Sequence, residues 1–257
     1  MGKSHPGKEI VEVAGVRNFR GLGGVKVGDK HFKFGLAFRC AHLSKIEEEG
    51  VKTLQKLNIR YNFDLRTTRE KAEKPDREIG GITRIDFDIL GAPTAGLSHE
   101  RHTNRKEFLA SAIPMTDLYV VMLNGCIERY REAIAKSIEC LLSGEPFLFH
   151  CSEGKDRTGI FAMLLLGMLG ASKEDILEDY MITNDIALAR ARKVAWSSVP
   201  LGLLNANKAY SLYVAKKSYM RSAFAYIDTF GGFVNFAKSQ LGVTQEQIDS
   251  LRVACLE

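Results

Sequence analysis

The sequence predicts an α/β fold, with a central, mostly parallel sheet of four or five strands flanked by helices and a helical C-terminal half. Segments with the length and pattern of strands occur at 59–65, 82–90 and 147–150, and the last of them is an apolar run. The last run leads through a polar loop into the unbroken apolar segment 159–166, which has the composition of a buried helix. Strands that alternate with helices in this way are typical of parallel sheets.

Turn and capping signals place further elements. Residues 25–34 have the pattern of a hairpin that turns at Gly28 and Asp29. Ser44 and Glu47 have the spacing of a capping box, which predicts a helix over 45–57. Apolar residues recur near helical spacing over 116–142, with Gly125 as the expected break. The polar segment 91–111 is expected to form a surface loop near the site.

Composition sets limits on the class of protein. The chain has 257 residues, 45% hydrophobic and 26% charged, which indicates a globular protein with a sizeable core. The net charge of +5 is spread along the chain and suits an anionic substrate, with no nucleic-acid partner indicated. No apolar run has transmembrane length, so stable membrane insertion is not expected.

The five cysteines indicate the compartment and argue against a metal centre. Their number is odd, their spacing is irregular and no Cys-x-x-Cys pair occurs, so neither a zinc site nor a disulfide framework is predicted. No metal and no cofactor are expected. The N-terminal residues lack the apolar core of a signal peptide, which predicts a cytoplasmic protein, with export by a signal-less route as the alternative.

The segment 147–159 carries the chemistry. Cys151 follows the strand, and Arg157 lies beyond five loop residues at the start of the next helix. Backbone N–H groups of such a loop, together with the positive end of the helix, attract an anion. A thiolate is a nucleophile, and a guanidinium can bind two phosphate oxygens at once. These residues predict phosphoryl transfer to Cys151, followed by hydrolysis of the thiophosphate without a metal ion.

The other loop residues have supporting roles in this interpretation. The backbone of residues 152–157 is expected to bind the phosphate oxygens. Thr158 is a candidate hydrogen-bond donor to the sulfur when it leaves, and His150 is expected to order the loop. The predicted substrate-binding residues of the loop and its helix are Ser152, Glu153, Gly154, Lys155 and Thr158.

The ten residues 150–159, His-Cys-Ser-Glu-Gly-Lys-Asp-Arg-Thr-Gly, resemble the signature loop of the protein tyrosine phosphatase superfamily. They are most similar to a branch of bacterial tyrosine and phosphoinositide phosphatases whose loop carries Lys and Asp before the Arg. The resemblance implies one phosphotyrosine-phosphatase-like catalytic domain over 1–257. It implies phosphotyrosine in proteins as substrate and phosphate as product, with a phosphoinositide as the alternative substrate. A non-catalytic phosphate-binding module ranks below both.

Further segments carry the resemblance. Residues 18–24 match an Asn-Phe-Arg-Asp-Leu-Gly-Gly motif of that branch, except that Gly21 replaces its Asp. This match makes Arg20 a candidate substrate-binding residue. Residues 64–70 and 175–184 also match. The resemblance further implies a helical lid over the site at 185–225, but two further core helices are the preferred interpretation of that segment.

The general acid is not fixed by these patterns. The chain has no Trp-Pro-Asp sequence, so the acid must come from elsewhere. Asp156 is the first candidate because a carboxylate beside a bound phosphate dianion is favoured in its protonated form. Asp64 is the second candidate, and Asp86 and Asp88 are the third. Lys155 could hold a second phosphate, as a phosphoinositide would offer, or could offset the neighbouring carboxylates.

Overall fold

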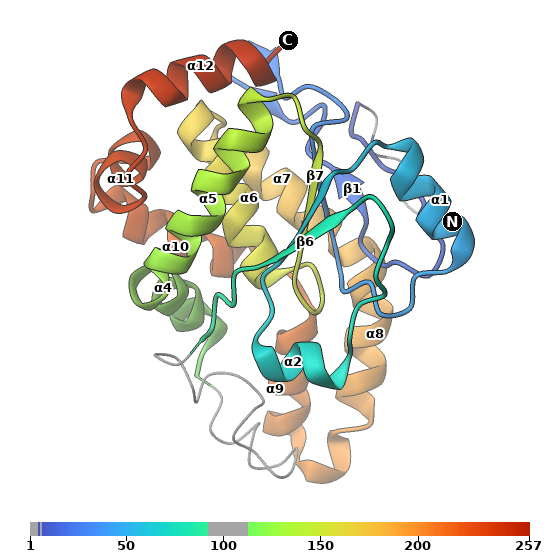
Figure 1. The fold of residues 1–257 in the computed structure, drawn as a ribbon. Coiled ribbons are helices and arrows are strands. Elements are labelled where there is room, and N and C mark those ends of the chain that lie inside the picture. The colour runs from blue at the N-terminus through green and yellow to red at the C-terminus, as the bar shows by residue number, and fades with distance from the viewer. Residues whose placement is uncertain (1–4, 6, 92–112) are drawn as a thin grey trace.

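A five-stranded sheet lies at the centre of the computed structural model, which describes residue 5, residues 7–91 and residues 113–257 (Figure 1). Its strands, in spatial order, are β1 (Arg20–Gly21), β4 (Ala37–Cys40), β7 (Phe147–His150), β5 (Tyr61–Asp64) and β6 (Thr83–Asp86). The last four are parallel to one another, and β1 pairs antiparallel with β4 at the edge. The predicted mostly parallel sheet is therefore confirmed.

Strand β7 occupies the middle of the sheet, and every one of its residues is buried. Phe147 and Phe149 belong to the larger hydrophobic core, where Phe147 stacks on Phe63 with ring centroids 4.8 Å apart. Leu148 points to the other face and belongs to a second, smaller core. A strand that is apolar on both faces requires cover on both sides, which is the situation in parallel sheets.

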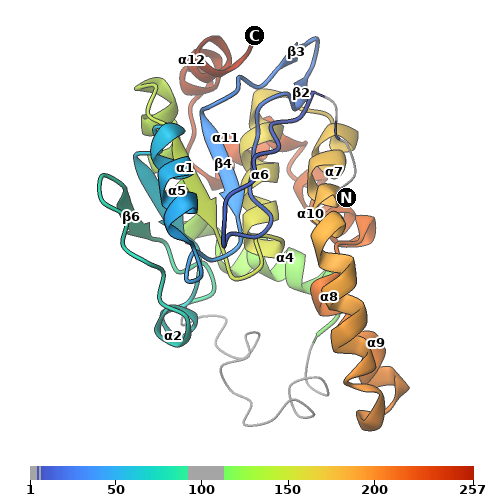
Figure 2. The same ribbon diagram turned by 90° about the vertical axis from the view of Figure 1, so that its right-hand side faces the viewer.

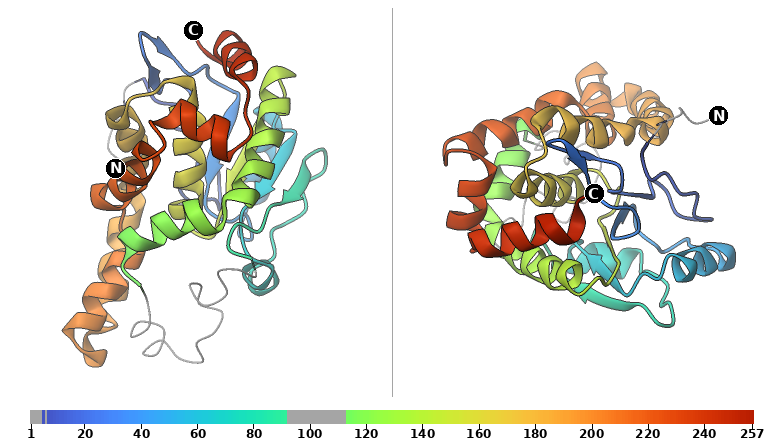
Figure 3. Two further views of the ribbon diagram at one scale, coloured as in Figure 1. Left: turned by 90° about the vertical axis from the view of Figure 1, so that its left-hand side faces the viewer. Right: turned by 90° about the horizontal axis from the view of Figure 1, so that it is seen from above.

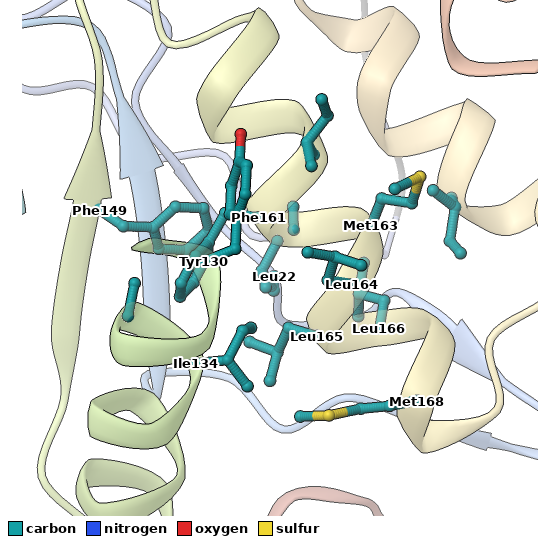
Figure 4. Packing of buried hydrophobic residues seen from close by; sticks show 14 of the residues in the cluster. Leu22, Tyr130, Ile134, Phe149, Phe161, Met163, Leu164, Leu165, Leu166 and Met168 are labelled. Carbon is teal, nitrogen blue, oxygen red and sulfur yellow. The ribbon is translucent and has the colours of Figure 1, made fainter. Parts of the chain in front are cut away.

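Helices cover the two faces unequally (Figure 3). The smaller core lies under α1 (Glu48–Lys56). The larger core lies under helices from the second half of the chain: α4 (Met115–Gly125), α5 (Ile127–Leu142), α6 (Asp156–Leu169), α7 (Lys173–Ile182), α10 (Lys217–Asp228), α11 (Phe233–Gln240) and α12 (Gln245–Cys255). Figure 4 shows Phe161 of α6 beside Phe149 and Tyr130, and the Phe161 and Phe149 ring centroids are 4.6 Å apart.

Most predicted boundaries hold within a few residues. Helices α4 and α5 meet at Cys126, one residue beyond the expected break. The hairpin appears as β2 (Lys26–Val27) and β3 (Lys30–His31). The capping box at Ser44 is wrong: α1 begins at Glu48, and the Ser44 hydroxyl hydrogen-bonds the His42 ring instead. Of the expected loop 91–111, residues 92–111 lie outside the described residues.

The segment 185–225 divides into two parts. Helix α10 packs against α4 and carries buried residues of the larger core. Helix α8 (Asn184–Trp196), the 3-10 turn η3 (Val199–Leu201) and α9 (Leu203–Tyr213) instead form a hairpin that projects away from the sheet (Figure 2). The buried residues of this helical hairpin, residues 184–213, are mainly alanines and one serine. The hairpin is therefore not a pair of core helices.

Among the described residues, no helix combines the length and apolar character needed to cross a bilayer.

Candidate active site

The loop between β7 and α6 lies at the carboxyl end of the parallel strands, which is the usual place for sites in such sheets (Figure 1). Cys151, directly after β7, is 2% exposed. In the described part of the chain, no backbone N–H group from 152 to 157 donates to a protein acceptor. Unpaired N–H groups at the positive end of a helix form a site for an anion.

Contacts from behind fix the direction of the loop peptides. Asn18 Nδ2 donates to the carbonyl oxygens of Glu153 and Gly154 over 3.3 and 2.9 Å, and Arg39 Nη2 donates to the Gly154 carbonyl over 3.1 Å. In a trans peptide the N–H points opposite to the carbonyl. The N–H groups of Gly154 and Lys155 therefore point away from Asn18, toward the inside of the loop.

The close approach of the loop to β4 requires glycine at 154. Gly154 has φ of +65°, and a Cβ atom there would lie 2.2 Å from the carbonyl oxygen of Cys40. The left-handed conformation disfavours other residues, and the contact leaves no room for a side chain. Glycine here is required by both the local backbone and the neighbouring strand.

Arg20 supports the loop from behind rather than facing its opening. It is 1% exposed, and its Nε donates to Asp179 over 2.8 Å while Nη1 donates to the Asn18 side chain over 2.7 Å. Arg39 donates to the other Asp179 oxygen over 2.5 Å. Burial favours the protonated acid, but the two guanidinium groups outweigh it and hold the pKa of Asp179 below its ordinary value. The structure thus does not bring Arg20 to the substrate side.

Arg157 is held by a residue that the sequence reasoning missed. Glu70, on α2 (Thr68–Glu73), binds the two terminal nitrogens of Arg157 over 2.5 and 2.7 Å. Burial would raise the pKa of Glu70, but the charge and hydrogen bonds of Arg157 hold it well below its usual range. Thr67 and Glu70 also form a capping box at the start of α2. That spacing was the signal in the sequence that could have located Glu70.

One edge of Arg157 remains available for a ligand. A guanidinium carries five N–H groups in a planar fork. Glu70 takes one at each terminal nitrogen, and the Leu65 carbonyl accepts from Nη1 over 3.3 Å. The Nε–H and the second Nη2–H, which lie parallel on one side, have no acceptor among the described residues. This edge has the geometry for two oxygens of one anion.

Asp64 lies in a separate buried network behind the loop. It is fully buried and accepts two hydrogen bonds from the Arg66 guanidinium, over 2.9 and 2.7 Å, and one from the Arg66 backbone N–H over 3.0 Å. Arg66 Nη2 also lies 2.7 Å from Asp76, and His150 Nε2 lies 3.1 Å from the same carboxylate. Asp64, Asp76 and His150 are close enough to one another to hold a metal ion. The positive charge between the two carboxylates is instead the guanidinium of Arg66. The structure does not bring Asp64 to the loop opening.

The other acid candidates differ in position. Asp156, the first residue of α6, has a 23% exposed side chain, and its Oδ1 accepts from the Tyr119 hydroxyl over 2.8 Å. Burial, followed by the charge of Asp156, raises the pKa of Tyr119 well above its ordinary value. Asp86 pairs with Lys71 and Arg84 on the edge strand β6. Asp88 accepts from Thr68 over 3.3 Å. Asp156 is the candidate that the loop itself carries.

Lys155 does not extend into the loop. It is fully buried, and its ammonium donates to the carbonyls of Leu212 and Val214 over 2.6 and 3.2 Å, at the end of α9. Its Nζ also lies 3.5 Å from Asp156. The possibility that Lys155 holds a second phosphate loses its support, because the amino group is already engaged.

The remaining predicted residues surround the loop. The Ser152 hydroxyl donates to Glu70 over 2.5 Å. Glu153 accepts from Arg190 of α8 over 2.7 and 2.8 Å and from Arg17 over 3.2 Å. The Thr158 hydroxyl is buried without a hydrogen-bond partner among the described residues. The structure gathers Cys151, Arg157, Asp156 and Thr158 around one loop.

Comparison with known proteins is consistent with this geometry. A family model described as the tyrosine phosphatase family matches residues 11–257. A Cupriavidus necator protein with a provisional tyrosine-protein phosphatase name is 29% identical over 91% of this chain and 84% of its own length. The triple specificity protein phosphatase PtpB of Mycobacterium tuberculosis is 31% identical over 71% of this chain and 72% of its own. The solved structure of TpbA from P. aeruginosa is more distant, with 15% identity over 88% of this chain and 89% of that one and a TM-score of 0.33.

Gly154 offers a direct test of the loop geometry. We expect Gly154→Ala to lower the free energy of unfolding by about 1–3 kcal/mol more than the matched change Gly144→Ala. Both glycines have φ of +65°, but an added Cβ meets no atom within 4 Å at Gly144. Urea unfolding of both variants separates backbone strain from the contact with Cys40. An equal decrease in the free energy of unfolding for the two variants would show that the contact between the loop and β4 does not contribute to stability.

Proposed function

The chain belongs to the tyrosine phosphatase family, and on this premise we propose that it hydrolyses phosphotyrosine in proteins through a thiophosphate on Cys151. One observation carries the proposal: N–H groups of the loop and one edge of Arg157, which have no acceptor among the described residues, lie at a helix start directly after a cysteine. This arrangement suits a phosphate dianion and presents its phosphorus to a sulfur.

The first step transfers the phosphoryl group. The loop N–H groups donate to the non-bridging phosphate oxygens, and Arg157 binds two of them through its Nε and Nη2 edge. The Cys151 thiolate attacks phosphorus, the S–P bond forms and the P–O bond to the tyrosine breaks. Asp156 donates a proton to the leaving phenolic oxygen. Glu70 keeps Arg157 in the orientation that this charge stabilisation needs.

The second step releases phosphate. Asp156, now ionised, accepts a proton from a water molecule that attacks phosphorus. The S–P bond breaks and its electron pair returns to sulfur, which restores the thiolate. The free hydroxyl of Thr158 donates a hydrogen bond to the departing sulfur. Phosphate leaves, and no external oxidant, reductant or metal ion is needed to balance the reaction.

Phosphotyrosine ranks above a phosphoinositide because of Lys155. A second phosphate on the substrate would need a second cation at the loop, and the Lys155 ammonium is engaged by the carbonyls of Leu212 and Val214. A binding module without turnover ranks lowest because the nucleophile, the guanidinium and an acid are all present on the loop.

The first prediction concerns the nucleophile. We expect wild-type protein to release phosphate from a phosphotyrosine peptide faster than from a phosphatidylinositol phosphate, and Cys151→Ser to release none from either. Cys255→Ser, at a buried cysteine on the last helix, should retain turnover. Binding of the peptide without hydrolysis by the wild type would instead favour the binding module, and faster release from the lipid would reverse the substrate order.

The second prediction concerns the acid. Asp156→Asn should reduce kcat by about 10²–10⁴-fold on phenyl phosphate, because its leaving oxygen requires a proton. The loss should be much smaller on p-nitrophenyl phosphate, whose leaving group is stable as an anion. Equal losses on the two substrates would show that Asp156 acts on the loop structure and not as a proton donor.

The third prediction concerns Glu70. Glu70→Gln should lower kcat/KM by about 10²-fold, because an arginine that is misplaced by even 1 Å loses most of its effect. Glu73→Gln on the same helix serves as control, because Glu73 is exposed and pairs with Arg69. An unchanged or higher kcat/KM for Glu70→Gln would mean that the carboxylate competes with phosphate for Arg157 and does not position it.

A further inference from the structure

The end of the helical hairpin exposes large apolar side chains. We call residues 196–204 the hairpin tip. Within it, Trp196 is 77% exposed, Leu203 74% and Leu204 80%. With Val199, the tip contains four of the nine large hydrophobic side chains that are exposed in the described part of the chain. An exposed apolar cluster of this kind usually marks an interaction surface.

The two helices that carry the tip are basic. Helices α8 and α9 contain Arg190, Arg192, Lys193 and Lys208 and one acidic residue, Asp185. Arg190 is paired with Glu153 at the catalytic loop, which leaves the other three cations of these helices nearer the tip. The exposed basic residues of α8 and α9 are Arg192, Lys193 and Lys208, and Lys216, Lys217 and Arg221 follow at the start of α10.

The tip and the catalytic loop lie toward the same end of the molecule. Figures 1 and 2 show α8 and α9 extending past the carboxyl ends of the strands, where the loop between β7 and α6 is found. The hairpin is also joined to the loop, because Arg190 of α8 binds Glu153 and the end of α9 binds Lys155. A surface that contacts the tip would therefore lie at the same end of the molecule as the site.

We propose that the hairpin tip binds the surface of a bilayer that contains anionic phospholipid. Trp196, Leu203 and Leu204 enter the interfacial region, where tryptophan is favoured, and the basic side chains contact the anionic headgroups. The protein lies on the surface and does not span it, because α8 has 13 residues and α9 has 11, against the roughly 20 that a membrane-spanning helix needs.

The combination of features favours a bilayer over other partners. A nucleic acid or an acidic protein would account for the basic helices but not for a cluster of exposed leucine and tryptophan. A second copy of the chain would cover the apolar tip but would bring two basic hairpins together, and like charges repel. An anionic bilayer accounts for both features.

Trp196 is the only tryptophan of the chain, so its fluorescence reports on the tip. We expect the emission of wild-type protein to shift to shorter wavelength with vesicles of phosphatidylcholine and phosphatidylserine. Vesicles of phosphatidylcholine alone should give little shift. High salt should reverse the shift, and the protein should sediment with the anionic vesicles. No shift and no sedimentation with anionic vesicles would overturn the proposal.

Two matched variants test the surface. The double change Leu203→Asp and Leu204→Asp should weaken vesicle binding by about tenfold or more, because carboxylates replace two leucine side chains that enter the bilayer. Val253→Asp, at a valine on α12 that is also 80% exposed, should bind as the wild type does. Both variants should keep the wild-type circular dichroism and turnover of a soluble aryl phosphate. Equal binding by the double variant would overturn the proposal.

Two further measurements separate bilayer binding from a contact between copies of the chain and from binding of substrate at the active site. A tryptophan shift that appears with rising protein concentration in the absence of vesicles, and that salt does not reverse, would identify the tip as a contact between copies and overturn the bilayer proposal. Cys151→Ser protein should bind anionic vesicles as the wild type does, because these vesicles contain no phosphate monoester. Vesicle binding therefore succeeds or fails independently of the proposed phosphatase activity.

Discussion

The site depends on the direction of two peptide bonds in one loop. Asn18 and Arg39 bind the carbonyls of Glu153 and Gly154 from behind, so the following N–H groups point inward. Asp179 holds Arg39 in place, and Arg20 holds Asn18 while binding Asp179. If these carbonyls were free to turn, the N–H groups of the loop would no longer be held toward the phosphate. The first strands, β1 and β4, and helix α7 therefore serve the loop without touching a ligand.

Three buried arginine systems surround this loop, and each is matched with one or more carboxylates. Arg20 and Arg39 share Asp179, Arg66 lies between Asp64 and Asp76, and Arg157 binds Glu70. A buried charge without a partner is strongly destabilising, so the pairs made by Asp179 and Glu70 specify how distant segments meet. Arg157 differs from the others because Glu70 occupies its end and leaves one edge for an anion. The same physical requirement thus produces both the fold around the loop and the function of one of its residues.

The helical hairpin is connected to this system through charged contacts. Glu153 binds Arg190, and Lys155 donates to the carbonyls of Leu212 and Val214, so neighbouring loop residues hold both helices. The hairpin contributes little to the apolar core, since mainly alanines are buried in it. Its basic helices and apolar tip are therefore free to meet a surface, and the anchored loop keeps that surface at the end of the sheet where the phosphate site lies.

The sequence by itself determined the elements whose signals are local. The apolar run 147–150, the loop from Cys151 to Arg157 and the helix after it follow from neighbouring residues, and so do the parallel sheet and the break near Gly125. The tertiary structure alone decided which side chains meet across long distances in the chain. Arg20 pairs with Asp179, Glu70 with Arg157 and Lys155 with the carbonyls that end α9, so Arg20 and Lys155 support the loop and Glu70 joins the site. No local pattern specifies such partners, because buried charges choose them only after the segments have packed together.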